Sequence, residues 1–124
     1  MPKALIIDKD PLISSLIEFM IAHSGIVDVM SFADPAQAVR CTKGCRDVGC
    51  IVYNCDSIVD ATVDEVVDTI REEHPNAKVL LLSEKNGSAV MRTRKYSTAG
   101  LGDRFFTLTL KRFIRSVLPP DSIE

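Results

Sequence analysis

Polar side chains follow several of the strand-like apolar runs in this 124-residue chain, each at the point where the run stops. They are Asp8, Lys9 and Asp10 after the first run, Asn54, Cys55 and Asp56 after the third, Ser83 and Glu84 after the fourth, and Thr107 after the fifth. Carboxylates are ligands that hard divalent cations prefer, so Asp8 and Asp10, taken alone, indicate an acidic metal pocket.

Strand-like runs and helical patterns alternate along the whole chain. Buried strands are predicted at residues 4–7, 26–32, 50–53 and 79–82, and a fifth strand is predicted around Phe105-Phe106. Helices are predicted to begin at Asp10-Pro11 and Asp34-Pro35, to cover residues 63–70, to lie around residues 89–96, and to end the fold over residues 110–118. The aspartate before each of these two prolines is a typical N-cap.

Strict alternation of strand and helix predicts an α/β domain with a doubly wound parallel sheet, covered by helices on both faces. Ligands of such sheets bind beyond the carboxyl ends of the strands, near the point where strand order reverses. The polar residues after the strands are therefore the candidate site. We expect one domain over residues 1–118, with residues 119–124 as a tail or the start of a linker.

Composition excludes several classes of protein. Hydrophobic residues make up 46% and charged residues 26%, which is ordinary for a globular domain and argues against disorder. The net charge of -2 gives no general reason to expect nucleic acid as a partner. No apolar run reaches the ~18 residues of a membrane span, and the first residues do not resemble a signal peptide. We therefore expect a cytoplasmic protein without a membrane partner.

Four cysteines lie close together in the sequence, at Cys41, Cys45, Cys50 and Cys55. They include no CxxC pair, whereas zinc sites usually have such tight, repeated spacing. Cys50 falls in a strand-like run and is expected to be a small core residue. Ordinary reduced thiols are the main interpretation, and a redox or metal sensor built on Cys41–Cys55 is kept as an alternative.

Three stretches of the sequence resemble response-regulator receiver domains. They are KALIIDKDPLI at residues 3–13, REEHPNAKVLLLS at residues 71–83, and Ala99-Gly100 with the closing FIRSVL at residues 113–118. The resemblance covers nearly the whole chain. It implies a flavodoxin-like fold, in which a five-stranded parallel sheet has the strand order 2-1-3-4-5.

The resemblance also implies a reaction and the residues for it. In this family an acidic pair after the first strand holds Mg²⁺, and an aspartate after the third strand accepts a phosphoryl group from a histidine kinase. A hydroxyl after the fourth strand and a lysine after the fifth bind the phosphoryl oxygens. Here Asp8 matches the first acidic residue and Ser83 the hydroxyl, but Lys9 replaces the second acidic residue and Asn54 the acceptor.

The third difference from the family is at the position of the lysine that binds the phosphoryl oxygens. Thr107 stands nearest to it, and alignment on the helical period makes the loop into the last helix about four residues short. These changes predict a degenerate receiver that is not an enzyme and needs no cofactor. Lys9 then either takes the place of the metal, pairing with Asp8 and the Asn54 carbonyl, or points to solvent. Asp10 is expected to act chiefly as a helix cap.

A working receiver remains the first alternative. Asp56 lies two residues beyond Asn54 and is the fallback phosphoacceptor, with Mg²⁺ needed only in that case. The second alternative is the cysteine-based sensor.

Basic residues toward the end of the chain form the predicted interaction surface. They are Arg92, Arg94, Lys95, Arg104, Lys111, Arg112 and Arg115. In receiver domains this side of the fold is the usual partner and dimer surface. The resemblance implies signalling proteins as partners, such as a histidine kinase or an output domain, or a homodimer through the fourth helix, fifth strand and last helix.

Overall fold

A computed structural model describes residues 2–25, 28–54, 61–83, 96–101 and 104–118, and all structural statements concern these residues. Their elements follow in the order β1 (Lys3–Ile7), α1 (Pro11–Ala22), β2 (Val29–Phe32), α2 (Pro35–Thr42), β3 (Val48–Asn54), α3 (Ala61–Glu73), β4 (Lys78–Ser83), β5 (Ser97–Gly100) and α4 (Phe106–Val117).

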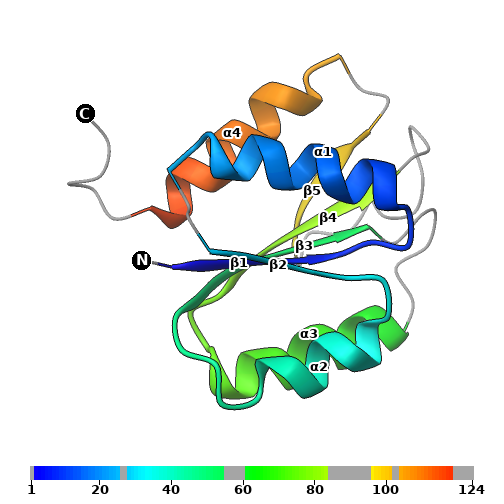
Figure 1. Cartoon of the computed structure of the whole chain (residues 1–124), viewed down its shortest axis with the longest axis vertical. Coiled ribbons are helices and arrows are strands. Elements are labelled where there is room, and N and C mark those ends of the chain that lie inside the picture. Colours follow the sequence, from blue (N-terminus) through cyan, green and yellow to red (C-terminus); the bar gives the residue numbers. More distant parts are fainter. Residues whose placement is uncertain (1, 26–27, 55–60, 84–95, 102–103, 119–124) are drawn as a thin grey trace.

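All five strands form one parallel sheet with the order β2-β1-β3-β4-β5, as predicted (Figure 1). Helices α1 and α4 lie on one face of the sheet, and α2 and α3 lie on the other (Figure 1). Because the strands are parallel, all of their carboxyl ends meet at one edge, which we call the carboxyl edge. No helix among the described residues has both the length and the apolar character that a membrane crossing requires.

The central strands are buried on both faces, which explains why their sequences are apolar without alternation. Ile6, Val52 and Leu82 face α1 and α4, and they belong to a core that includes Ile17 and Ile114. Their strand neighbours Leu5, Ile51 and Leu81 face α2 and α3 and join a second core around Val67 and Ile70. The sheet is therefore fixed between two separate apolar layers.

The first two helices begin as the sequence predicts. The Asp10 carboxylate accepts hydrogen bonds from the backbone N–H groups of Leu12 and Ile13, at 2.9 and 3.4 Å. The Asp34 carboxylate accepts one from Ala36 at 3.0 Å. Proline follows each cap, where the missing N–H costs no helical hydrogen bond. These caps fix where the chain turns from a strand into a helix.

The predicted fifth strand was wrong. The fifth strand is β5, Ser97–Gly100, which pairs with Leu80–Ser83, whereas Phe106 opens α4 and is buried there. The small residues of β5 give a weak strand signal at the edge of the sheet. Phe106 lies four residues before Leu110, so it extends the apolar stripe of the last helix. The helix predicted around residues 89–96 falls outside the described residues apart from Tyr96, and the predicted tail 119–124 falls outside them entirely.

Burial of the two apolar layers predicts a clear difference between two leucine substitutions. Leu81→Ala should lower the free energy of unfolding by about 2–5 kcal/mol, because Leu81 is fully buried and truncation leaves a cavity. Leu12→Ala, at a side chain that is 81% exposed, should change it by less than about 0.5 kcal/mol. Urea denaturation followed by circular dichroism measures both, and equal losses would contradict the assigned layers.

Candidate functional site

Asp8 is the buried carboxylate of the carboxyl edge. It directly follows β1, and only 4% of its surface is exposed. Its Oδ1 accepts a hydrogen bond from the backbone N–H of Asp10 at 2.8 Å, and its Oδ2 accepts one from Asn54 Nδ2 at 3.2 Å. A charged group can be buried when donors of this kind replace its water.

Asn54 reaches Asp8 because β1 and β3 are neighbours in the sheet. The two strands pair Ile7 with Tyr53, so Asp8 and Asn54 are the next residues along each strand. Asn54 is the last residue of β3 and is half-buried. The sheet register thus brings together two residues that are 46 positions apart. The resemblance predicted their proximity, but it did not predict that the amide would donate to the carboxylate.

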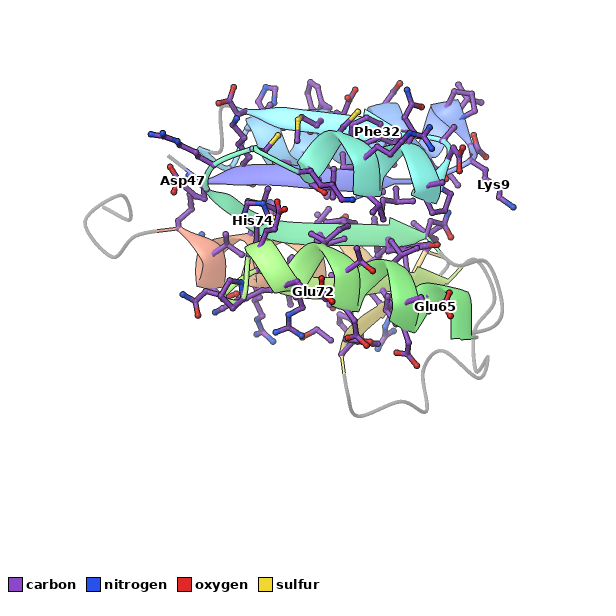
Figure 2. All side chains as sticks on the ribbon, turned by 90° about the horizontal axis from the view of Figure 1, so that it is seen from below. Lys9, Phe32, Asp47, Glu65, Glu72 and His74 are labelled. Carbon is purple, nitrogen blue, oxygen red and sulfur yellow. The ribbon has the colours of Figure 1, made fainter. Side chains whose placement is uncertain are left out.

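Lys9 does not lie between Asp8 and Asn54. Its side chain is exposed and extends away from the ribbon (Figure 2). Of the two orientations considered from the sequence, the pairing of Lys9 with Asp8 and the Asn54 carbonyl is therefore wrong for this structure. An ammonium group on a flexible stem is well solvated in water, which favours the exposed orientation of Lys9.

Asp10 acts as the cap of α1, as predicted. One of its carboxylate oxygens, Oδ1, accepts hydrogen bonds from the N–H groups of Leu12 and Ile13 in the first helical turn. Its own backbone N–H also donates to Asp8, so the cap and the buried carboxylate support each other.

The other predicted site residues are placed as follows. Ser83 ends β4 at the carboxyl edge, where it pairs with Gly100, but its side chain lies outside the description. Asp56 lies in residues 55–60, outside the described residues. Thr107 is exposed in the first turn of α4, so its predicted place directly after the fifth strand was wrong. β5 ends at Gly100 and α4 begins at Phe106, so residues 101–105 connect them. The shortening of this loop relative to the family stays a prediction.

The basic residues predicted as an interaction surface are only partly described. Arg104 is exposed, and its guanidinium lies 4.7 Å from the centroid of the Phe105 ring. Lys111, Arg112 and Arg115 are exposed on α4. Arg92, Arg94 and Lys95 lie outside the described residues. The described part of the predicted surface therefore consists of the exposed basic residues of α4 and of Arg104, which lies just before this helix.

One hydrogen bond and one exposed group of side chains were not predicted from the sequence. The Tyr96 hydroxyl donates to the Asp64 carboxylate at 2.5 Å, which ties the start of β5 to α3 across the second core. On α1, Leu12, Leu16 and Phe19 are more than half exposed. The spacing of Leu12 and Leu16 next to Ile13 and Ile17 is typical of a buried helix side, but both leucines lie on the exposed side of α1.

The oxygen atoms that the described residues offer do not match the magnesium ligands of the receiver family. That site would need oxygen ligands, usually with one or two carboxylates aimed at the metal. Both Asp8 oxygens accept hydrogen bonds from N–H groups, Asp10 Oδ1 caps a helix, and the second acidic position is the exposed Lys9. We therefore derive no step through a metal at this edge.

The described cysteines do not form a metal site, and the buried Cys50 thiol is hard to ionise. No group of three metal-ligating side chains occurs among the described residues. Cys41 is exposed, and the Cys45 thiol donates to the Cys41 carbonyl at 2.9 Å. Burial raises the pKa of the Cys50 thiol to about 12 from 9.0, so it stays protonated at neutral pH. Cys55 lies outside the described residues.

Two hollows in the described surface lie near the amino ends of the strands, opposite the carboxyl edge. One is lined by residues that include Pro2, Asp47 and Lys78, and another by residues that include Cys45 and His74. Figure 2 shows Asp47 and His74 at the far end of the molecule from Lys9. Ligands of parallel α/β sheets bind at the carboxyl edge, so these hollows are not candidates for the site.

The hydrogen bonds of Asp8 predict unequal effects of two neighbouring substitutions. Asp8→Ala should lower the free energy of unfolding by about 1–3 kcal/mol, because it leaves the Asn54 amide and the Asp10 N–H without this acceptor. Lys9→Ala should change it by less than about 0.5 kcal/mol, since Lys9 is exposed. Urea denaturation of both variants tests this. A loss at Lys9→Ala as large as at Asp8→Ala would show that Lys9 is inserted beside Asp8.

The two environments of Cys41 and Cys50 predict different alkylation rates. At about pH 8 iodoacetamide should modify Cys41 readily and Cys50 only after denaturation, because the thiolate is the nucleophile and burial keeps Cys50 protonated. Peptide mass mapping reads both sites, and modification of native Cys50 at the rate of Cys41 would contradict the assigned burial.

Comparison with known proteins gives a result at the level of structure only. No protein-family model matches the sequence, and no curated protein matches it. Solved structures are similar over nearly the whole chain. A response-regulator receiver domain protein of Clostridium thermocellum has a TM-score of 0.72 at 16% identity, covering 99% of this chain and 98% of that one.

Two further structures extend the comparison. The response regulator TrrA of Thermotoga maritima, solved in complex with Mg²⁺ and BeF, has a TM-score of 0.70 at 17% identity, covering 95% of this chain and 100% of that one. A protein provisionally assigned to pilus assembly in Burkholderia pseudomallei has a TM-score of 0.68 at 17% identity, covering 96% and 93%. With the sheet order and layers described above, these likenesses show that the chain has the fold of response-regulator receiver domains.

Proposed function

We propose that this chain is a degenerate receiver domain of two-component or phosphorelay signalling, which acts as a protein-interaction module independent of phosphorylation. One observation carries the proposal. Asn54 ends β3, where the resemblance implies the phosphoacceptor aspartate, and its amide donates a hydrogen bond to Asp8. Asp8, the carboxylate that would help to hold the metal in a working receiver, thus accepts an internal hydrogen bond.

The chemistry of the amide supports this proposal. Covalent phosphorylation at this position requires a carboxylate oxygen that attacks phosphorus and forms an acyl phosphate. A carboxamide has no such nucleophilic oxygen. The Asn54 Nδ2–H group also donates a hydrogen bond to Asp8 Oδ2, and this bond stabilises the buried carboxylate.

The charges nearby support it as well. A divalent cation at this edge would find Asp8 as its matching carboxylate, beside the positive Lys9. Lys9 is exposed, so water and salt screen much of its repulsion. The missing second carboxylate therefore weighs more heavily against metal binding than the lysine charge does.

The function that remains for such a domain is recognition of other proteins. The basic residues of α4, together with Arg104, offer a charged surface on one layer of the fold. The partners that we propose are signalling proteins in the cytoplasm, of the class of histidine kinases and output domains. The domain would associate with them without enzymatic turnover and without a bound cofactor.

Phosphorylation by a small phosphodonor tests the proposal. Radiolabelled acetyl phosphate with Mg²⁺ should leave the purified protein unlabelled, because neither Asn54 nor the metal ligands can support the transfer. Beryllofluoride with Mg²⁺ should likewise leave its amide NMR spectrum unchanged. The variant with both Lys9→Asp and Asn54→Asp restores the two missing carboxylates and is the positive control for the assay.

The same assay distinguishes the working-receiver alternative. Asp56→Ala is the matched control variant, since Asp56 is the fallback acceptor. If the wild type takes up label and Asp56→Ala abolishes it, the chain is a phosphoreceiver and the proposal is wrong.

A further inference from the structure

A hollow of about 340 Å³, which we call the amino-edge pocket, lies at the amino ends of β4 and β5. Lys78, the first residue of β4, and Ser97, the first residue of β5, line it. Arg71 of α3 and Ser116 of α4 line it as well, and these two helices lie on opposite faces of the sheet (Figure 1). Ligands of parallel sheets usually bind at the opposite edge, so any role of this pocket must follow from its own lining.

Two cationic side chains line the amino-edge pocket. Arg71 is half-buried in the last turn of α3, and its guanidinium forms no hydrogen bond or ion pair within the described part of the chain. Lys78 donates one hydrogen bond from Nζ to the Ser116 carbonyl oxygen at 2.8 Å, which leaves two further N–H donors. No aspartate or glutamate is among the described residues that line the pocket. The pocket therefore combines an excess of positive charge with several free donors.

The rest of the lining is mainly polar. Ser97 is exposed, and its hydroxyl can both donate and accept. Ser116 Oγ donates to the Phe113 carbonyl at 2.6 Å, so its oxygen can still accept a hydrogen bond. Tyr96 and Phe113 are buried and offer the pocket little apolar surface, and the Tyr96 hydroxyl is bound to Asp64. Two serine hydroxyls beside two cations suit a ligand that carries hydroxyl groups as well as a negative charge.

The anion that best matches these two cations is a phosphomonoester. An arginine binds two phosphate oxygens with its planar fork, and a lysine binds phosphate as a point charge. A phosphomonoester carries about −1.5 to −2 charges at pH 7, so it balances both Arg71 and Lys78, whereas a single carboxylate balances only one. Ligand cavities usually have volumes of about 300–1,000 Å³, and this pocket is near the lower limit. The group that carries the phosphate should therefore be small.

We propose that the amino-edge pocket binds a small phosphorylated metabolite whose body carries hydroxyl groups, which is the chemical class of the sugar phosphates. Arg71 and Lys78 hold the phosphate group, and Ser97 and Ser116 face the hydroxyl groups of the body. The pocket is remote from the carboxyl edge, so the proposal goes beyond the proposed function and does not depend on it.

A purely structural role of the two cations explains less of the geometry. Cations are favoured near helix C-termini, and both the position of Arg71 in the last turn of α3 and the bond from Lys78 to α4 agree with such a role. That role does not explain a half-buried guanidinium without an acceptor among the described residues. Two like charges that line one hollow also repel, and an anion between them removes this repulsion.

Titration with ribose 5-phosphate tests the proposal. Amide NMR spectra of the purified chain at low ionic strength should show saturable shifts that include Val79, Ser97 and Ser116, which line the pocket. Ribose lacks the phosphate group and inorganic phosphate lacks the hydroxylated body, so each should bind at least about tenfold more weakly. Sodium chloride at about 0.5 M should weaken the binding of ribose 5-phosphate, because salt screens the attraction between the phosphate and the two cations.

Variants of the protein assign the binding to this pocket. Arg71→Gln and Lys78→Gln should each weaken the binding of ribose 5-phosphate by about tenfold or more, because each removes a charged donor. Arg40→Gln is the matched control, since it removes the same charge from an exposed arginine of α2, and it should change nothing. Circular dichroism checks the fold of each variant. Lys78 is exposed, so Lys78→Gln decides the question if Arg71→Gln does not fold.

Several results would overturn the proposal. Absence of saturable shifts would show that the cations of this pocket have a structural role only. Equal affinity for inorganic phosphate would show that the pocket does not recognise a hydroxylated body, and equal affinity for ribose would show that it does not recognise phosphate. Shifts confined to the carboxyl edge, or an equal loss of affinity on Arg40→Gln, would show that the ligand does not bind at Arg71 and Lys78.

Failure of this proposal can be separated from failure of the proposed function. Binding of ribose 5-phosphate together with phosphodonor labelling of the wild type would contradict the degenerate receiver and leave the amino-edge pocket standing. A wild type that takes up no label and binds no ribose 5-phosphate would contradict the amino-edge pocket alone.

Discussion

The hydrogen bond from Asn54 to Asp8 is the interaction on which the interpretation of the whole molecule depends. It joins the ends of the two central strands, β1 and β3, at the edge where parallel α/β proteins place their ligands. The bond replaces part of the water that a buried carboxylate would otherwise need, and the N–H of Asp10 provides a second donor. Because Asp10 also caps α1, the buried carboxylate, the strand end and the start of the helix form one connected unit.

Some parts of this arrangement could be predicted from the sequence, and others could not. The caps at Asp10 and Asp34 and the sheet order followed from local signals and from family resemblance, and the structure confirms both. The meeting of Asp8 with Asn54 was predicted as well, because each was placed at the end of a central strand. Which atoms would bond was not predictable, since the choice between Lys9 and Asn54 as the partner of Asp8 depends on side-chain direction and solvation.

The predictions that were wrong also have local physical causes. β5 consists of Ser97, Thr98, Ala99 and Gly100, which carry almost no strand signal, and its pairing with Leu80–Ser83 is a tertiary effect. Phe105-Phe106 carried a stronger signal and was wrongly taken as the strand. The exposed Leu12 and Leu16 show a different limit. The helical period identifies apolar residues, but α1 packs on β1, β2 and α4 and leaves part of its apolar surface uncovered, which only the packing reveals.

The carboxyl edge and the exposed apolar side chains of α1 are physically connected through the first turn of that helix. The Asp10 carboxylate caps the first turn of α1, and the backbone N–H of Asp10 donates to Asp8. The exposed Leu12 lies within this first turn. If phosphate and metal do not act on Asp8, the described hydrogen bonds at that edge would hold the start of α1 in one position. The exposed side of α1 would then be presented in one arrangement, and the fraction bound to a partner would depend on partner concentration and ionic strength. A domain of this kind would contribute constitutive docking, with any regulation located in the partner.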